Sequence, residues 1–254
     1  MHVDTYFDKI FLPKPDSHKG ENGRVLVIGG SKLFHAAPFW AAAAASRIVD
    51  MVHFSSPASE NDELMRVRAK EHFWDGIVVS WADVEHYIQE DDAILIGPGM
   101  ERGEETKKIV NELLAKYPEK KWVIDGGALQ EVEPKLLNKN MIVTPNQREL
   151  EILGDKIPSG VTILAKGPVD IVSNGTEKEE ITGGSAGMTK GGTGDVLAGI
   201  VTGLYAKSEA FPAAVVASQV NKRAGEALAK ERGTFFNASE LVSEVGKVLG
   251  NLQL

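Results

Sequence analysis

Short apolar runs alternate with longer segments of mixed polarity along this chain. The short runs have the length and composition of buried β-strands, and they are RVLVI at 24–28, followed by a Gly-Gly turn, MVHF at 51–54, IVV at 77–79, AILIG at 93–97, WVID at 122–125, MIVT at 141–144 and TILA at 162–165. The segments between them that predict helices are AAPFWAAAAASRIV at 36–49, DVEHYIQ at 83–89 and EETKKIVNELLAKY at 104–117. Strands that alternate with helices indicate an α/β fold with a mostly parallel central sheet and helices on both faces.

The two ends of the chain have different patterns. Residues 1–23 are polar and rich in proline and glycine, which predicts an exposed lead-in. The pair Asn174-Gly175, inside the segment 170–182, is a hairpin signal and predicts two antiparallel strands. Helices are expected after the hairpin, namely one from Gly194, one over 212–231 and one over 238–249, the last with a cap at Ala238-Ser239.

The composition narrows the class of protein. A chain of 254 residues, 43% hydrophobic and 25% charged, has room for the core of one large domain, so we expect a single domain over residues 1–254. It has no apolar stretch long enough to span a membrane, no basic and apolar leader, and no cysteine, so we expect a cytoplasmic protein. The net charge of −8 argues against nucleic acid and anionic membranes as partners. An anionic ligand must therefore be held by local backbone amides and a few lysines.

Small and polar residues directly follow the predicted strands. The carboxyl ends of parallel strands share one edge of a sheet, and ligands of open α/β folds bind at that edge. A single glycine after a strand is often only a tight turn, but repetition at one edge favours a long ligand cleft; the sites are 29–31, 97–99, 125–127, 144–146, 166–167 and 183–195. Lys166 is either a surface lysine at a turn or a point charge for a phosphate.

The segment from Gly183 to Val201, GGSAGMTKGGTGDVLAGIV, joins a glycine-rich loop to an apolar helix. Glycines at a helix N-terminus let a phosphate approach unpaired backbone N–H groups, which predicts an anion site at Gly191, Gly192 and Gly194. Asp195 would repel a phosphate, so it fits better as a base that acts on the attacking group. The simpler alternative is that Thr193 or Asp195 only caps the helix.

Other motifs do not fit. GPGMERG at 97–103 is spaced GxGxxxG rather than GxGxxG, and Pro98 lacks an amide that a pyrophosphate would use. GGSAG at 183–187 matches the pattern of a hydrolase elbow, but no histidine follows His86. The sequence has no GxxxxGK[ST] loop. No metal-ligand spacing is present, so we expect no metal site built from the histidines, which are His2, His18, His35, His53, His72 and His86.

GMTKGGTGDVLAG resembles the anion-hole and catalytic signature of ribokinase-like proteins, most closely that of the ADP- or ATP-dependent NAD(P)H-hydrate dehydratases. The resemblance extends from Lys19 to the final helix. HKGENGRVLVIGGS resembles the opening of that family, AAP at 36–38 its GAP, IGPGM its GPG loop, and TPN at 144–146 its TPH. It implies a three-layer ribokinase-like α/β fold.

The resemblance also implies site residues. The hydrated nicotinamide nucleotide would be contacted by Ala37, Gly99, Asn146 and Asp195, with Asp195 as the catalytic residue. Asn146 stands where the family has histidine, and an amide can donate a hydrogen bond but cannot be a cation. The ADP or ATP site would comprise Lys166, Gly167, Pro168, Val169, Asp170, Gly191, Gly192, Thr193 and Gly194.

The activity implied by the resemblance is the dehydration of NADHX and NADPHX, the 6-hydrated forms of the reduced nicotinamide nucleotides. ADP or ATP would be the co-substrate, with Mg²⁺ bridging its phosphates, and we expect a homo-oligomer and a separate epimerase that acts on the same substrate. One alternative is a ribokinase-like kinase of a small alcohol, such as a sugar or a vitamin precursor. A nucleotide-binding regulatory protein without turnover is another, for which a change at Asp195 would be expected.

Overall fold

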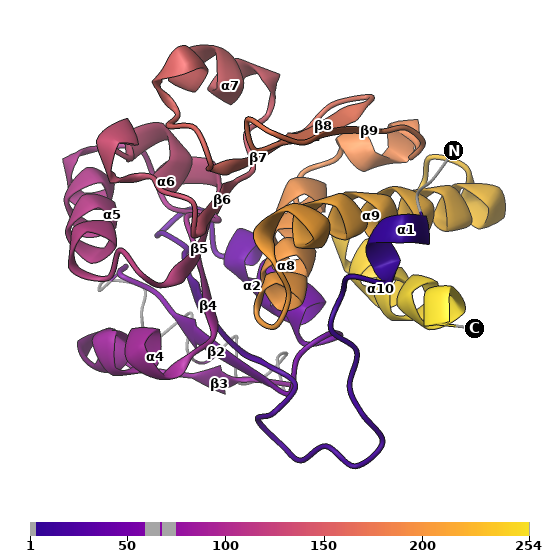
Figure 1. Cartoon of the computed structure of the whole chain (residues 1–254), viewed down its shortest axis with the longest axis horizontal. Coiled ribbons are helices and arrows are strands. Elements are labelled where there is room, and N and C mark those ends of the chain that lie inside the picture. Colours follow the sequence, from indigo (N-terminus) through magenta and orange to yellow (C-terminus); the bar gives the residue numbers. More distant parts are fainter. Residues whose placement is uncertain (1–3, 59–66, 68–74, 254) are drawn as a thin grey trace.

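The computed structural model describes residues 4–58, 67 and 75–253, and its described part contains one nine-stranded sheet (Figure 1). The strand order is β3-β2-β1-β4-β5-β6-β7-β8-β9. The strands are β1 (Arg24–Ile28), β2 (Met51–Ser55), β3 (Ile77–Val78), β4 (Ala93–Ile96), β5 (Lys121–Ile124), β6 (Met141–Val143), β7 (Thr162–Ala165), β8 (Asp170–Ser173) and β9 (Lys178–Ile181). Each strand predicted from an apolar run is therefore confirmed to within about two residues at its ends.

The strands β1 to β7 run parallel to one another, whereas β8 and β9 pair antiparallel at the edge beside β7. The mostly parallel sheet and the hairpin at Asn174-Gly175 are both confirmed. The carboxyl ends of β1 to β7 consequently meet at one edge, where the loops with small and polar residues lie.

Helices cover both faces of the sheet (Figure 1). Successive residues of β1 show the division, because Val25 and Val27 belong to one buried core whereas Leu26 and Ile28 belong to the other. The first core is covered by α2 (Ala36–Ala45), α8 (Thr193–Tyr205), α9 (Ala210–Arg232) and α10 (Ala238–Gln253), and the second by α4 (Val84–Glu90), α5 (Glu104–Lys116), α6 (Gly126–Glu131) and α7 (Gln147–Leu153). This is the predicted three-layer arrangement. In the described part of the chain, no helix is both long enough and apolar enough to cross a membrane.

Close contact with α2 positions α8, the helix that carries Asp195. The second half of α2 is largely buried through Ala41, Ala42, Ala44 and Ala45, and a Cβ built at Gly199 of α8 would lie 2.1 Å from the carbonyl oxygen of Ala41. The two backbones therefore meet without side chains between them. This contact fixes the N-terminus of α8 against the rest of the core.

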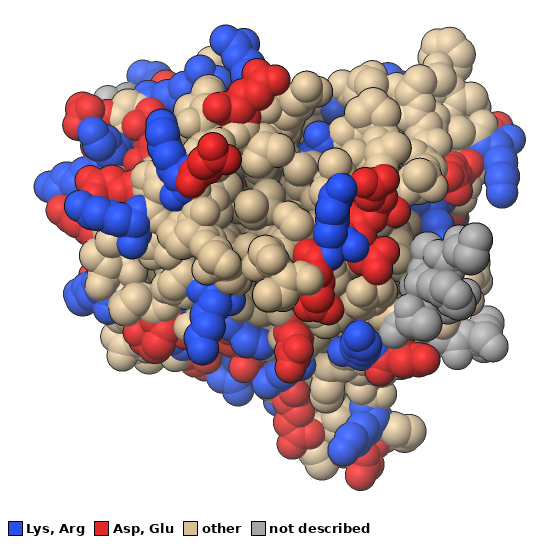
Figure 2. Space-filling model, turned by 45° about the horizontal axis from the view of Figure 1, so that its top comes forward, with Lys and Arg blue, Asp and Glu red and all other residues tan. Residues whose placement is uncertain are grey.

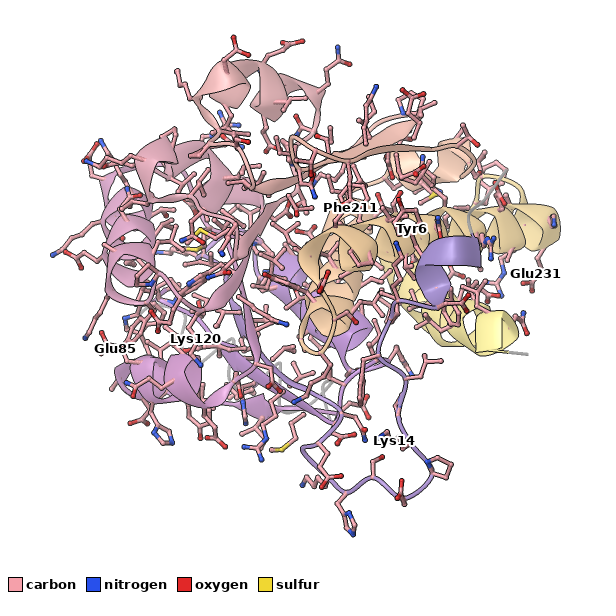
Figure 3. All side chains as sticks on the ribbon, viewed as in Figure 1. Tyr6, Lys14, Glu85, Lys120, Phe211 and Glu231 are labelled. Carbon is pink, nitrogen blue, oxygen red and sulfur yellow. The ribbon has the colours of Figure 1, made fainter. Side chains whose placement is uncertain are left out.

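The expectation of an exposed lead-in over residues 1–23 is partly wrong. Residues 4–7 form a short helix, α1 (Asp4–Phe7), and the ring of Tyr6 lies 5.8 Å from the ring of Phe211 on α9 (Figure 3). Ile10 is only 7% exposed. The segment is polar on average, but its few apolar residues, such as Tyr6 and Ile10, pack against the rest of the protein and hold it there.

The cap of the last helix also differs from the prediction. Asn237, rather than Ala238-Ser239, opens α10, because its Oδ1 accepts a hydrogen bond from the backbone N–H of Glu240 at 3.1 Å. The side chain of Glu240 in turn accepts from the N–H of Asn237 at 2.9 Å. This is a capping box one residue earlier than expected.

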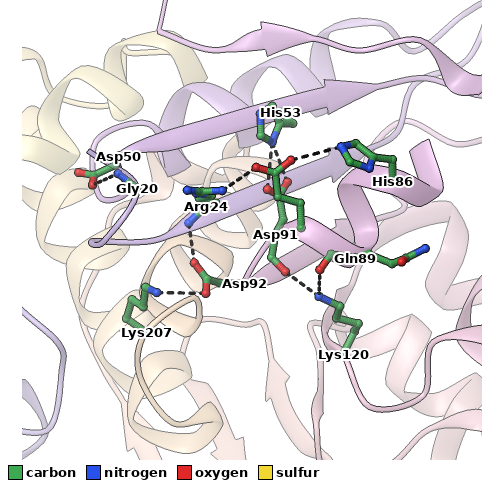
Figure 4. Close-up of polar contacts among 11 residues, drawn as sticks. Gly20, Arg24, Asp50, His53, His86, Gln89, Asp91, Asp92, Lys120 and Lys207 are labelled. Carbon is green, nitrogen blue, oxygen red and sulfur yellow. Dashed lines mark hydrogen bonds and ion pairs between the residues drawn. The ribbon is translucent and has the colours of Figure 1, made fainter. Parts of the chain in front are cut away.

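A network of charged side chains closes the opposite edge of the sheet, at the amino ends of the strands (Figure 4). The backbone N–H of Arg24 donates to Asp92 at 2.9 Å, and Lys207 forms an ion pair with Asp92 at 3.1 Å. The buried His53 lies 2.9 Å from Asp91, whose pKa is raised because burial outweighs the nearby histidine. These contacts join β1, β2, the segment before β4 and the segment after α8. Their role at this edge of the sheet is to stabilise the fold.

Candidate active site

The glycine-rich loop ends at Gly192, which is the N-cap of α8. Gly192 has φ 94°, a left-handed conformation that favours glycine, and no side chain caps the helix. The Thr193 hydroxyl instead donates to the carbonyl oxygens of Met188 at 2.6 Å and Lys190 at 3.0 Å. The alternative that Thr193 or Asp195 is the N-cap is therefore wrong. The Thr193 N–H donates to the Lys190 carbonyl oxygen at 3.5 Å, and without a side-chain cap an anion can meet the next N–H of the first turn, that of Gly194.

Two residues from other strand ends lie beside the start of α8. Lys166, after β7, forms an ion pair with Asp125, after β5, with 2.6 Å between Nζ and Oδ1. The same Oδ1 accepts a hydrogen bond from the Thr144 hydroxyl at 2.7 Å. A Cβ built at Gly194 would lie 3.5 Å from the Lys166 ammonium, which therefore borders the first turn of α8. A cation and free amides meet at this point, as an oxyanion site requires.

Asp195 has an unusual protonation equilibrium. Burial, and secondarily the negative charge of Asp125, raise the pKa of its carboxyl to about 7, whereas Lys166 opposes this change. Burial lowers the pKa of Lys166, but nearby carboxylates outweigh this effect and raise it, so the lysine stays charged. A carboxyl with a pKa near neutrality is suited to accept and return a proton. This property suits the predicted role of Asp195 as a general base, which stays a prediction.

A cavity of about 730 Å³ borders Lys166 and Gly194, whereas Asp195 and Asp125 are not among the residues that line it. Of the residues predicted to bind the nucleotide, those that line it are Lys166, Gly167, Pro168, Asp170, Thr193 and Gly194, whereas Val169, Gly191 and Gly192 do not. Gly192 has a packing reason to be glycine, since a Cβ there would lie 2.4 Å from the Trp40 ring. The glycine pattern alone does not distinguish close packing from phosphate approach.

Two further side chains, Asp170 and Lys222, hold the loop that borders the cavity. Asp170 was expected to contact the nucleotide, yet its carboxylate accepts from the Gly167 N–H at 2.8 Å and from the Ser218 hydroxyl at 2.7 Å. Lys222, which was not singled out, donates to the carbonyl oxygens of Gly167 at 3.2 Å and Pro168 at 3.1 Å. Both hold the 166–170 loop in place. The polar residues Ser218, Asn221 and Lys222, which are buried on one face of α9, were the signal available in the sequence.

The residues predicted to bind the hydrated nucleotide fall in two places. Gly99 and Ala37 are neighbours, because a Cβ built at Gly99 would lie 3.3 Å from the Ala37 Cβ and 2.4 Å from the Phe34 carbonyl oxygen. Asn146 instead lines the 730 Å³ cavity, and its backbone forms an isolated parallel β-bridge with that of Lys166. Its Oδ1 is occupied as the N-cap of α7, accepting from the Glu149 N–H at 3.0 Å. Its role toward the substrate stays a prediction.

The surface charge (Figure 2) and the possible metal ligands bear on the expectations from the sequence. On the face shown in Figure 2, basic side chains are interspersed with acidic ones. Among the described residues, no group of three or more histidine, aspartate or glutamate side chains could hold a metal ion. His2 and His72 lie outside the described residues.

Comparison with known proteins identifies the family. A family model described as NAD(P)H-hydrate dehydratase matches residues 25–247. A bifunctional NAD(P)H-hydrate repair enzyme of Methanocaldococcus jannaschii is 37% identical in an alignment 243 positions long, which covers 92% of this chain and 49% of that protein. An ADP-dependent (S)-NAD(P)H-hydrate dehydratase of Nitrosopumilus maritimus is 33% identical, with 97% of this chain and 96% of that protein covered.

A solved structure is also similar to this chain. It is that of the ADP/ATP-dependent NAD(P)H-hydrate dehydratase from Bacillus subtilis co-crystallized with ATP/Mg²⁺, with a TM-score of 0.80, 20% identity, and coverage of 99% of this chain and 96% of that one. Structural likeness confirms the predicted ribokinase-like fold. The chain spans about half the length of the bifunctional relative. On its sequence and its fold, the chain belongs to the NAD(P)H-hydrate dehydratase family.

Proposed function

We propose that this protein dehydrates NADHX and NADPHX to NADH and NADPH with ADP or ATP as co-substrate. The observation that carries the proposal is Asp195, a carboxyl with a pKa of about 7 at the uncapped start of α8 and next to the charged Lys166. Membership of the dehydratase family and the name of the Nitrosopumilus maritimus relative support this substrate.

The reaction needs a better leaving group than hydroxide. Asp195 takes the proton of the C6 hydroxyl as the terminal phosphoryl group of the nucleotide passes to that oxygen, which turns ADP into AMP or ATP into ADP. The C6–O bond then breaks, inorganic phosphate leaves, and loss of a proton from the neighbouring carbon restores the ring double bond. The chain lowers the barrier by positioning and by charge stabilisation.

The nucleotide would lie in the 730 Å³ cavity, a volume in the range of small-molecule sites. Its terminal phosphate would meet Lys166 and the N–H groups at Gly194, while Gly167 and Pro168 would flank the rest. Mg²⁺, when bound, neutralises charge on the nucleotide phosphates.

The hydrated nucleotide would approach Asp195 from the side of Ala37, Gly99 and Asn146. Gly99 has φ 72° and packs against Ala37 and the segment before α2, whereas Asn146 lies at the 730 Å³ cavity. We also propose that the protein acts in the cytoplasm as a homo-oligomer, and that a separate epimerase prepares its substrate. Light scattering of the purified protein tests the oligomeric state.

The test of this function is turnover with each nucleotide. The protein is incubated with NADHX or NADPHX, Mg²⁺ and either ADP or ATP, and the absorbance of the reduced nicotinamide is followed. The proposal expects absorbance to rise only when a nucleotide is present. A nucleotide-dependent phosphorylated product of a sugar or vitamin precursor, with no reduced nicotinamide formed, would instead identify a kinase of a small alcohol.

A further inference from the structure

One face of α9 forms the inner wall of the 730 Å³ cavity. Ser218, Asn221, Lys222 and Gly225 occupy positions i, i+3, i+4 and i+7 of the helix and therefore lie on the same side of it. Asn221 and Lys222 line the cavity directly. Gly225 accommodates Met188, another lining residue, because a Cβ there would lie 2.2 Å from its sulfur.

The neighbours of Asn221 on this face have partners within the protein. The Ser218 hydroxyl donates to Asp170 at 2.7 Å, and the Lys222 ammonium donates to the Pro168 carbonyl oxygen at 3.1 Å. One turn further on, Glu226 accepts from the Gly184 N–H at 3.0 Å. These contacts hold the two loops that border the cavity, so the hydrogen-bonding capacity of these side chains is used by the fold.

Asn221 differs from them. It is 5% exposed, and its Oδ1 is buried without a hydrogen-bond partner among the residues that the structure describes. A buried acceptor left unsatisfied is destabilising, so such a group in a cavity wall calls for a ligand donor that satisfies it. Asn221 therefore combines a place in the cavity wall with an unpaired acceptor, as expected of a binding residue. No structural hydrogen bond through Oδ1 explains why an amide is buried at this position.

The cavity has a charged end and an apolar part. Lys166 and Gly194 supply the cation and the amides, whereas Leu197, Met188 and Pro168 contribute apolar surface to the same cavity as Asn221. A ligand with an anionic group and a flat, mostly apolar group that carries an N–H donor fits both parts. A nucleotide has this chemistry, with its phosphates at the first part and its base at the second.

We propose that Asn221 selects adenine, by accepting a hydrogen bond from the 6-amino group of the base at Oδ1. The inference rests on the proposed function, in which a nucleotide occupies this cavity. A carboxamide also carries N–H donors, so its Nδ2 can pair with a ring nitrogen of adenine next to the amino group. The amino group supplies the donor that the buried Oδ1 lacks.

The test compares two nucleotides that differ at one group. ADP and purine riboside 5′-diphosphate, which lacks only the 6-amino group, are titrated calorimetrically into the wild-type protein and into Asn221→Leu. We expect the wild type to prefer ADP by about tenfold, the effect of one hydrogen bond to an otherwise unsatisfied group. Asn221→Leu should bind both nucleotides with equal affinity. An unchanged preference in Asn221→Leu overturns the assignment.

A matched control separates this role from a structural one. Gln219 is a second buried amide on α9, 5% exposed, but it does not line the cavity, so Gln219→Leu should keep the preference for ADP. Without nucleotide, Asn221→Leu should melt no lower than the wild type, because it removes an unpaired acceptor. A lower melting temperature would indicate a structural role and contradict the inference. Should Asn221→Leu fail to fold, Asn221→Ala gives the same comparison.

The outcomes separate the two proposals. If the wild type binds neither nucleotide, both the nucleotide site and the role of Asn221 are wrong. If it binds both nucleotides equally well, the nucleotide site stands and only the role of Asn221 is wrong.

Discussion

Replacing Asp195 with asparagine tests the base directly, because the two side chains have nearly the same shape. The change removes the group that accepts the proton but leaves the first turn of α8 and Lys166 in place. We expect turnover to fall by about 10²-fold or more, the scale of a lost general base, while ADP still binds. In the wild type, kcat/KM should rise with pH through about 7 as the Asp195 carboxyl ionises.

The same substitution has a predictable effect on stability. A change in pKa from the ordinary 3.8 to about 7, at about 1.36 kcal/mol for each pH unit, means that the charged carboxylate is disfavoured by about 4 kcal/mol in the folded protein. Because the folded pKa is the higher one, the protonated carboxyl favours folding at low pH, and this stability is lost as pH rises through about 7. Asparagine does not titrate. The free energy of unfolding of Asp195→Asn, measured relative to that of the wild type, should therefore increase by up to about 4 kcal/mol between pH 4 and pH 8.

Urea unfolding of both proteins across this pH range measures the difference, in which the other titrating groups cancel. Near-normal turnover in Asp195→Asn, together with parallel stability curves, would refute the reasoning. Asp195 would then be an ordinary residue of the first helical turn.

Two further predictions concern the groups around Asp195. Asp125→Asn removes a negative charge that raises the Asp195 pKa, so the midpoint of the pH–rate profile should move to lower pH; Lys166→Met removes the opposing positive charge and should move it to higher pH. Shifts in the same direction would show that these charges do not control the base. Gly194→Val places methyl groups beside the Lys166 ammonium, and we expect ADP binding measured by calorimetry to fall by at least about tenfold with the protein folded. The control Gly246→Val, where a Cβ meets nothing within 4 Å, should bind ADP normally, and equal affinities in the two variants would place the phosphate elsewhere.

Much of the fold could be predicted from local pattern. Buried parallel strands are continuous apolar runs, so each was visible in the sequence, and the hairpin had its Asn-Gly turn. The short helices α6 and α7 were not predicted, because six or seven residues give too little periodicity and α6 begins with two glycines. The sheet order, with β1 between β2 and β4, depends on long-range pairing that no local pattern records.

The candidate site was predictable where one segment carries its chemistry. Asp195 follows directly from the loop that precedes it, and Lys166 was a candidate from its place after β7. Their connection was not predictable, because Asp125 reaches Lys166 across 41 positions of sequence. Asn221 was overlooked for a related reason: the polar residues on this face of α9 were visible in the sequence, but they match no known motif. Only the structure brings it to the wall of the cavity.

The most direct test of the central claim is the stoichiometry of a quenched time course. NADPHX, ADP and Mg²⁺ are mixed with the enzyme, and NADPH, AMP and inorganic phosphate are quantified in the same samples. The account predicts that the three products appear in equal amounts at every time after the first turnover. NADPH formed without AMP, or AMP formed with a stable phosphorylated substrate and no NADPH, would contradict it.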